Sequence, residues 1–475
     1  MKKLNLFLLA VLGVTTLHAA KIDQVIVRQQ WPWSTDIKVE YRLLEVDAAH
    51  PVDLALKAYN GDVELPLPEA AITGDRYGIT DAVGTFVIDP VVAFGTEKVA
   101  LANFKVKLTV SDSPENIGEV LYRIYNMTSG ACTDITRAEI LNGKYGAYET
   151  DYAKIGDGFS TPLEDVLIWT GVTNYPGIYT TNLVMRKIAA KDKVWLMGDE
   201  PDAIHNKSML TSQQGYTKLT EDFFIGVFEL TQYQYHKMDQ YGTAGYLHTD
   251  DPESRYPADG IYRYRLHSHP TGGTGTGMVT GEVVAWPTNS YLHDVGSNTA
   301  LAWLRNKTGV EFDLPTAAQW EFACRAGTTN SLYSSKLHKL TNAGETNAKE
   351  LGWMEGSSGG TTHLGGLKPA NAFGLYDMQG NVSEYVQNAS NAYANPTSGD
   401  GLSATTPLVD PKGNSDVSKN RVLKGVSYND KPGTWHDARS GMCAAFYDWT
   451  AGGSPYSCLG ARLVCPVNAQ WAPHN

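Results

Sequence analysis

The chain has 475 residues, of which 42% are hydrophobic, and a formal net charge of −12 from 39 basic and 51 acidic side chains. A chain of this length and apolar content can bury at least two separate cores. The acidic balance argues against a nucleic-acid partner, because such binding depends on Lys and Arg contacts to phosphates. Beyond the N-terminus, no apolar run approaches the roughly 18 residues of a membrane span, so none is expected.

The first twenty residues have the order of a secretory signal peptide. Lys2 and Lys3 precede an apolar run over residues 6–14, and small residues end the segment at Ala19 and Ala20. This pattern predicts cleavage after residue 20 and export, to the periplasm or outside the cell.

Residues 21–110 alternate between apolar and polar side chains in short runs, such as Ile37–Leu43 and Phe104–Val110. This alternation predicts antiparallel strands and an all-β, sandwich-like domain. Trp31 and Trp33 flank Pro32, and two interpretations are open for them: an exposed binding pair, or packing in the core or at an edge, which we favour. Residues 111–186 contain scattered strand-like runs and are interpreted as a β-rich connecting segment.

From about residue 187 the composition shifts to many Gly, Trp, Tyr and Asn residues with few long periodic segments. Apolar periodicity predicts two amphipathic helices, over residues 230–238 and 298–307. A third helix is predicted with Thr316 as its N-cap and its end at residues 325–327. Residues 187–468 are therefore expected to form a loop-rich α+β domain.

Five cysteines in an exported chain allow at most two intramolecular disulfides. Cys132 stands alone in the first half, so pairing among the four later cysteines is favoured over buried thiols. These four are Cys324, Cys443, Cys458 and Cys465.

The segment Asn371–Val386 places two carboxylates, Asp377 and Glu384, on either side of Gly380 and Asn381. Carboxylate oxygens at this spacing, with a glycine that lets backbone carbonyls turn inward, suit calcium. The alternative is a solvated turn whose carboxylates face water.

Four motifs, in this order and spacing, resemble the formylglycine-generating enzyme, or sulfatase-modifying factor, family. They are Phe223–Tyr233 (FFIGVFELTQY), Phe312–Thr328 (FDLPTAAQWEFACRAGT), Asn371–Val386 (NAFGLYDMQGNVSEYV) and Leu459–Cys465 (LGARLVC). The resemblance covers roughly residues 187–468 and implies a loop-rich, C-type-lectin-like fold. It also implies a calcium ion held by the Asp377 and Glu384 side chains and the Gly380 and Val382 carbonyls.

The resemblance breaks down at the active site. Family enzymes carry two cysteines shortly after a lysine-glycine-glycine-serine-aromatic stretch, and these thiolates bind copper(I) and activate oxygen. The stretch is present here as residues 424–428 (KGVSY), but the cysteine positions hold Asp430 and Trp435. Neither side chain can replace a thiolate, so copper is not expected, and one thiol at Cys443 would not restore the pair.

Several other side chains are candidates for a site. Two interpretations are open for the residues around the expected cleft: they bind a polar or glycan ligand, or they form a surface loop without a ligand. These residues are Asp430, Trp435, His436, Asp437 and Arg439. His267 and His269 could chelate zinc, although a loop before Pro270 is favoured. The glycine-rich residues 271–277 indicate a loop, since they lack the rest of a phosphate-binding motif. For His363 we expect a structural hydrogen bond.

The resulting functional hypothesis is an exported, non-catalytic module with structural calcium that binds or scaffolds a protein or glycan. One alternative is a formylglycine-generating oxidase that converts a sulfatase cysteine through another thiol such as Cys443, or a divergent oxidase. The other is a structural protein of the cell envelope.

Overall fold

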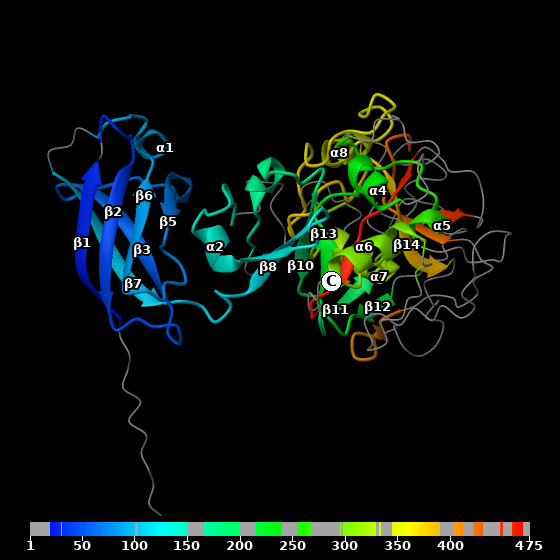
Figure 1. Cartoon of the computed structure of the whole chain (residues 1–475), viewed down its shortest axis with the longest axis horizontal. Coiled ribbons are helices and arrows are strands. Elements are labelled where there is room, and N and C mark those ends of the chain that lie inside the picture. Colours follow the sequence, from blue (N-terminus) through cyan, green and yellow to red (C-terminus); the bar gives the residue numbers. More distant parts are fainter. Residues whose placement is uncertain are drawn as a thin grey trace, which may run out of the picture. The chain divides into compact units, whose positions relative to one another are not determined.

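The structure is a computed structural model of the chain (Figure 1). It describes residues 20–29, 31–99, 103–150, 166–198, 215–239, 254–267, 295, 298–328, 332–333, 344–389, 403–411, 421–430, 447–449 and 458–468. The chain divides into two compact units. Residues 1–119 and 137–144 make the first, and residues 120–136 and 145–475 make the second.

The first unit contains two antiparallel sheets. One has the order β1-β2-β6-β5 and the other β4-β3-β7. Their strands are β1 (Lys21–Gln29), β2 (Ile37–Leu44), β3 (Val52–Asn60), β4 (Val63–Leu65), β5 (Ile72–Gly74), β6 (Val83–Ile88) and β7 (Phe104–Asp112). Three short helices accompany them: η1 (Glu69–Ala71), α1 (Pro90–Phe94) and α2 (Arg137–Leu141).

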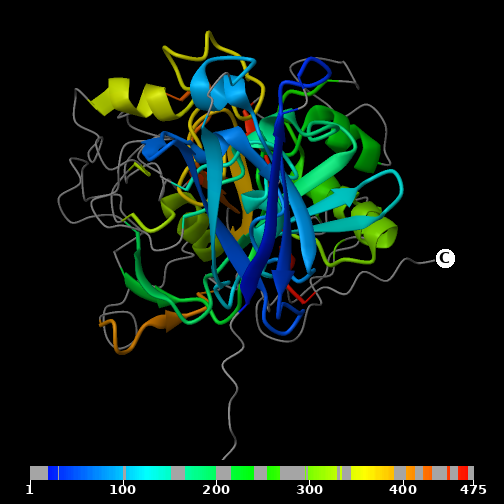
Figure 2. The ribbon, with the colours of Figure 1, turned by 90° about the vertical axis from the view of Figure 1, so that its left-hand side faces the viewer.

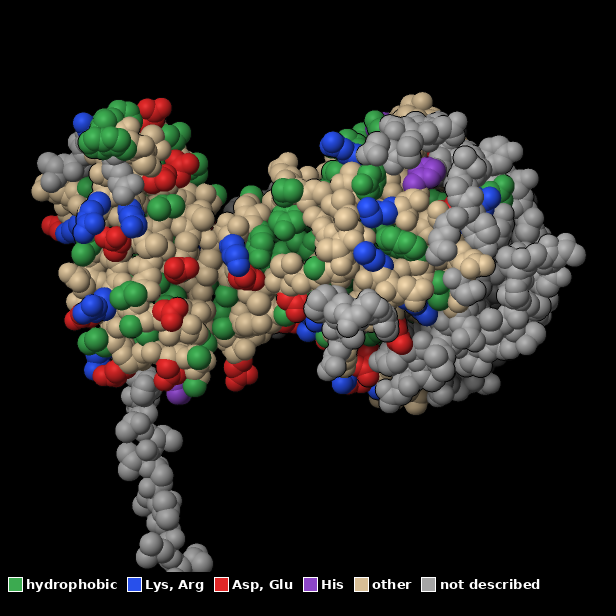
Figure 3. All heavy atoms as spheres, in the orientation of Figure 1, with side chains coloured by type: hydrophobic (Ala, Val, Ile, Leu, Met, Phe, Trp, Pro, Cys, Tyr) green, Lys and Arg blue, Asp and Glu red, His purple; other side chains and the backbone are tan. Residues whose placement is uncertain are grey.

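The core of this unit lies between its two sheets. Alternate residues of β2, from Ile37 to Leu43, are buried, and they share one hydrophobic cluster with Val52 and Leu54 of β3. The strands of both sheets run in roughly the same direction (Figures 1 and 2). This is an aligned β-sandwich, as the alternation of the sequence predicts. Its outer surface mixes Lys and Arg with Asp and Glu side chains on the face drawn in Figure 3.

The preferred interpretation of the tryptophan pair is wrong. Trp31 is 39% exposed and Trp33 is 91% exposed. Both lie in the turn between β1 and β2, beyond the paired part of these two strands.

The second unit is organised around a five-stranded sheet in the order β19-β13-β10-β8-β9. Its strands are β8 (Val120–Asn126), β9 (Cys132–Thr136), β10 (Asn182–Ile188), β13 (Phe223–Gly226) and β19 (Val464–Pro466). Strands β8 and β9 and most of β10 come from residues 111–186, interpreted from the sequence as a connecting segment. That segment therefore supplies much of the central sheet.

Both faces of this sheet are buried. Phe223 and Ile225 belong to one hydrophobic cluster, with α7 (Ala317–Arg325) and part of α8 (Gly344–Leu351). Phe224 between them belongs to a second cluster, with α4 (Gln232–Met238) and α6 (Ala300–Thr308). Because successive strand residues point to opposite faces, an all-apolar strand is the expected sequence for a sheet covered on both sides.

The three predicted helices are confirmed. Helix α4 begins after Thr231 and α7 after Thr316, and each has a capping box in which the N-cap threonine and the glutamine three residues later bond to each other's backbone. Helix α6 begins after Thr299. Helix α7 ends at Arg325, and its C-cap Ala326 is in the left-handed conformation, with φ 45°, within the predicted end at residues 325–327.

The remaining elements of the second unit are shorter. A three-stranded sheet has the order β11-β12-β15 and a four-stranded sheet the order β17-β16-β14-β18. They comprise β11 (Val194–Met197), β12 (Gly215–Lys218), β14 (Ser383–Ala389), β15 (Leu408–Val409), β16 (Arg421–Lys424), β17 (Tyr447–Trp449) and β18 (Leu459–Gly460), alongside η2 (Thr170–Asn174) and α5 (Arg263–Leu266). Among the described residues, no helix is long and apolar enough to span a membrane.

The predicted disulfides are not formed by the described cysteines. Cys458 and Cys465 have free thiols, and Cys324 is also a thiol. Cys324 in α7 contacts the Met378 carbonyl oxygen at 3.8 Å, whereas Cys465 in β19 contacts the Tyr125 hydroxyl at 3.9 Å. Buried cysteines of this kind behave as small apolar side chains. Cys443 lies outside the described residues.

Candidate functional site

The segment Asn371–Val386 forms an irregular turn that leads into β14. Asp377, Gly380 and Asn381 have positive φ angles of 53°, 95° and 65°. A side chain at position 380 would place its Cβ 2.5 Å from the backbone nitrogen and 2.6 Å from the carbonyl oxygen of Trp353. Glycine is therefore required there both for the turn and for the close approach of the two backbones.

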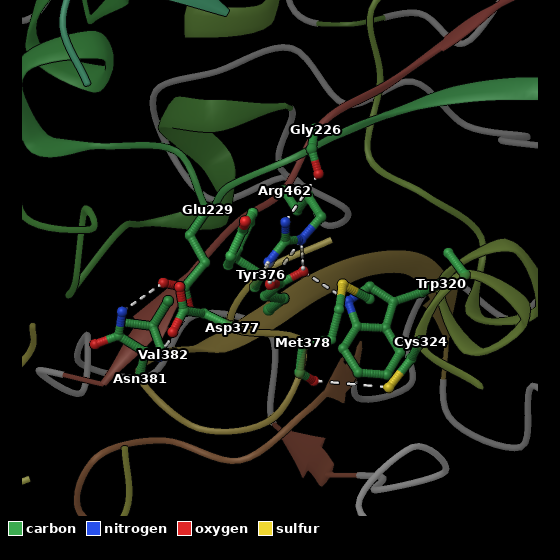
Figure 4. Close-up of polar contacts among 12 residues, drawn as sticks. Gly226, Glu229, Trp320, Cys324, Tyr376, Asp377, Met378, Asn381, Val382 and Arg462 are labelled. Carbon is green, nitrogen blue, oxygen red and sulfur yellow. Dashed lines mark hydrogen bonds and ion pairs between the residues drawn. The ribbon is translucent and has the colours of Figure 1, made fainter. Parts of the chain in front are cut away.

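Glu384 is fully buried and paired with a buried arginine, Arg462, which is labelled in Figure 4. The Glu384 Oε1 atom lies 3.0 Å from Nη2 and 3.1 Å from Nε of the guanidinium. Its Oε2 atom accepts hydrogen bonds from Arg462 Nε at 3.3 Å and from Trp320 Nε1 at 2.6 Å. Both carboxylate oxygens of Glu384 are therefore occupied by N–H donors.

Glu229, from the first family motif, holds the turn from the other side. Its two carboxylate oxygens accept from the Val382 backbone N–H at 3.0 Å and the Asn381 side-chain amide at 2.7 Å. Burial, followed by the negative charges of Asp377 and Glu384, raises the pKa of Glu229 well above its usual range. Three buried carboxyl groups thus lie near one another.

Asp377 is the least satisfied of these groups. Its Oδ2 atom accepts from the Gly366 backbone N–H at 2.8 Å, but Oδ1 is buried and has no hydrogen-bond partner among the described residues. Burial raises the pKa of Asp377 to about 6. An unpartnered buried carboxylate oxygen is a suitable ligand for a cation.

Of the four predicted calcium ligands, Glu384 does not fit the ion in this geometry. Asp377 offers a free oxygen, but both oxygens of Glu384 bond to Arg462 and Trp320. The positive guanidinium next to Glu384 would also repel a divalent cation at that carboxylate. In this geometry Glu384 is a partner of an arginine.

A second buried ion network joins two other family motifs. Lys424 Nζ lies 2.9 Å from Glu321 Oε2, and neither side chain is exposed. Glu321 Oε1 accepts from Arg325 Nε at 2.9 Å and from the Gly198 backbone N–H at 2.7 Å. The lysine of the KGVSY stretch therefore anchors β16 to α7.

Asp430 stands where the family's first active-site cysteine is expected. Its Oδ2 atom accepts from the backbone N–H of Ser427 at 2.7 Å and from the Ser427 hydroxyl at 2.8 Å. The carboxylate therefore closes a local turn after β16. The other cleft candidates, Trp435, His436, Asp437 and Arg439, lie outside the described residues.

The thiol of Cys458, predicted from the sequence only as a possible disulfide partner, lies near this position. The charge of Asp430 and a contact with the Ser427 side chain both act on Cys458. Burial, followed by the Asp430 charge, raises the pKa of this thiol to about 12, and the Ser427 contact opposes the rise. Cys458 therefore stays protonated at neutral pH.

The histidine candidates have structural surroundings. His363 Nε2 is 2.7 Å from the Ser358 carbonyl oxygen, and its ring stacks on Trp353 with centroids 3.8 Å apart. The expected structural hydrogen bond is confirmed. His267 Nε2 lies 3.1 Å from the Asp313 carboxylate, and His269 and residues 271–277 lie outside the described residues.

The motifs contact one another in the fold although they are far apart in the chain. Comparison with known proteins identifies the family to which they belong. The sulfatase-modifying factor enzyme 1-like domain matches residues 195–466, more than half of the chain. The chain belongs to this family. The mixed α+β fold of the second unit agrees with that membership, so the predicted fold class is confirmed.

Two curated relatives match parts of the chain. A formylglycine-generating enzyme of Mycobacterium tuberculosis is 39% identical over 83 residues, which cover 15% of this chain and 26% of that protein. The chain thus spans only about a quarter of that enzyme. The chaperone protein LppX of Paenibacillus barcinonensis is 23% identical over 209 residues, which cover 40% of this chain and 71% of that protein.

Two solved structures are also similar. The Treponema denticola variable protein 1 has 23% identity and a TM-score of 0.40, with 60% of this chain and 96% of that chain covered. PvdO from Pseudomonas aeruginosa has 18% identity and a TM-score of 0.36, with 60% of this chain and 95% of that chain covered.

Sequence reasoning missed the residues that hold these family motifs together. Glu229, Glu321 and Arg462 lie inside the four quoted motifs, yet the only side chains of these motifs that were predicted to be functional are those of Asp377 and Glu384. The available signal was a charged side chain within an otherwise apolar run, as in LGARLVC for Arg462. Such residues are almost never buried unless they are paired.

Proposed function

We propose that this chain is a non-catalytic member of the sulfatase-modifying factor family, which serves as an exported binding or scaffolding module. The observation that carries the proposal is the side chain at the first active-site cysteine position. The Asp430 carboxylate offers hard oxygen ligands and already accepts two hydrogen bonds from Ser427, whereas copper(I) requires soft sulfur ligands. The sequence places a second non-sulfur side chain, Trp435, at the other position.

The thiol near Asp430 does not compensate for the missing pair. A cysteine acts as metal ligand or nucleophile in its thiolate form, and the raised pKa of Cys458 keeps it protonated. This favours a role in which the cleft recognises a partner and performs no oxidation.

The proposed ligand is a protein or a glycan. Trp435, His436 and Arg439, together with Asp430, would supply one stacking surface and several hydrogen-bonding groups. The match to a protein named as a chaperone is compatible with a binding role. Export rests on the N-terminal sequence alone, and N-terminal sequencing of the protein from its cells should find Lys21 first.

The catalytic question is tested with the full chain, a cysteine-containing sulfatase peptide, copper(I) and oxygen. Mass spectrometry should detect no formylglycine under conditions in which an authentic formylglycine-generating enzyme converts the peptide. Robust turnover would overturn the proposal. If that turnover disappeared in Cys443→Ser, the thiol-dependent oxidase would be the correct function.

The binding role is tested separately on a glycan array and by pull-down from the exported proteins of the source cell. A partner retained by the wild-type chain should be lost in Trp435→Ala and kept in Trp33→Ala. The reverse result would overturn the cleft proposal and assign binding to the exposed tryptophans between β1 and β2. Trp33 is a suitable control because it belongs to the other unit and is almost completely exposed. Equal retention by both variants would exclude the proposed cleft as the binding site.

A further inference from the structure

Arg462 contacts the same class of acceptors that a calcium ion would use. Besides both oxygens of Glu384, its guanidinium donates to the Gly226 carbonyl from Nη1 at 2.8 Å and to the Tyr376 carbonyl from Nη2 at 2.7 Å. Two carboxylate oxygens and two backbone carbonyl oxygens therefore surround one buried positive group (Figure 4). Oxygen ligands of these two kinds are typical of calcium sites.

The guanidinium also makes the connections that a structural ion would make. Gly226 ends β13, Tyr376 precedes Asp377 in the turn, and Glu384 lies in β14. Arg462 itself lies between β18 and β19. One side chain thus ties together three segments that are distant in the sequence, the end of β13, the segment Asn371–Val386 and its own loop between β18 and β19, with a planar fork whose geometry matches a carboxylate.

We propose that the guanidinium of Arg462 takes the structural place of the calcium ion expected at this segment, so that the folded domain needs no metal there. This goes beyond the proposed function, since it holds whether or not the cleft binds a partner. Breaking the arrangement should be costly, because a buried carboxylate without its partner is strongly destabilising.

The observation that opposes the proposal is the unpartnered Oδ1 atom of Asp377. The charged groups that act on Asp377 are Glu229, Glu384 and Arg462 within the cluster and Lys368 from the preceding loop. An ion held by Asp377 alone among the carboxylates would leave the Glu384–Arg462 pair in place. The experiment must therefore separate these two arrangements.

Thermal unfolding of the full chain should be measured in calcium and in excess chelator, with calorimetric titration of calcium into the chelator-treated protein. We expect the same Tm in both solutions and no binding heat. A Tm that falls on chelation, recovers with calcium and loses this dependence in Asp377→Asn would overturn the proposal.

Arg462→Lys provides a second, independent measurement. Lysine keeps the positive charge but cannot donate to all four acceptors at once, so Tm should drop by several degrees, equally with calcium and with chelator. Arg255→Lys, at an exposed arginine of the same unit, should leave Tm unchanged. If Arg462→Lys were as stable as the wild type, the guanidinium would not be the structural element proposed here.

Discussion

At the scale of single residues, the charged side chains that matter most are those with no exposed surface. Lys424 and Glu321 form such a pair, and the Lys424 ammonium lies in the interior between β16 and α7. A buried pair contributes little net stability compared with a well-packed apolar pair, but the loss of one partner is expensive. Such residues therefore tolerate substitution poorly.

Lys424→Met should destabilise the second unit by about 3–5 kcal/mol, because the buried charge of Glu321 would lose one of its two cationic partners among the described residues and keep only Arg325. Urea unfolding followed by tryptophan fluorescence measures the change. Lys218→Met is the matched control, since Lys218 pairs with Asp192 at 3.3 Å on the surface and should cost less than about 1 kcal/mol. Equal losses in both variants would contradict the buried ion pair.

The same network predicts a pH dependence. Burial acts to raise the pKa of Glu321, but the charges of Lys424 and Arg325 outweigh it and hold the pKa below the usual 4.5. A lowered pKa in the folded state gives stability that is present above pH 4.5 and is lost as the pH falls through the folded-state value. The difference in unfolding free energy between the wild type and Glu321→Gln should therefore shrink below that pH. A difference that stayed constant down to acid unfolding would exclude this linkage.

At the scale of elements, local sequence signals predicted the helices and the tight turn. Thr316 and Gln319 close a capping box within four residues of sequence, so the start of α7 can be predicted without knowing its neighbours. Gly380 combines a positive φ with the backbone of Trp353 directly against it. The sequence indicated the turn, but only the fold shows what lies opposite.

Gly380→Ala should lower Tm more than Gly359→Ala does. Both glycines have positive φ angles, 95° and 67°, so each alanine pays a conformational cost of about 1–2 kcal/mol. A Cβ at Gly359 meets nothing within 4 Å, whereas one at Gly380 would overlap the Trp353 backbone. Thermal unfolding of the two variants measures the difference, and similar Tm values would show that the turn can move away.

At the scale of the whole molecule, the second unit depends on contacts between the ends of its sequence. Tyr125 in β8 and Cys465 in β19 touch across 340 residues of chain. Strand β19 pairs with β13, and β18 pairs with β14. The last strands therefore complete two sheets at once.

Deletion of residues 458–475 should prevent the second unit from folding, because it removes β18, β19 and Arg462 together. Deletion of residues 469–475 removes none of these and should leave Tm unchanged. Circular dichroism and thermal unfolding distinguish the two outcomes. A cooperative transition at the normal Tm in the longer deletion would show that these strands are dispensable.

The sequence by itself determined the features that depend on near neighbours in the chain. Period-two alternation predicted β2 and β7, apolar periodicity predicted α4 and α6, a threonine cap predicted α7, and ordered motifs predicted the family. Each of these signals lies within a few residues to a few tens of residues. They also showed that sulfur is missing from the expected copper ligands at positions 430 and 435.

Only the tertiary structure decided which charges meet. Glu384 was predicted to bind calcium because its neighbours in sequence suit that ion, but its partner is Arg462, 78 residues further along the chain. The exposure of Trp33 and the separate surroundings of Cys324 and Cys465 were likewise not readable from spacing. Pairing and burial depend on which residues the packed sheets bring together. The separation of two residues along the sequence does not predict the distance between them in the folded chain.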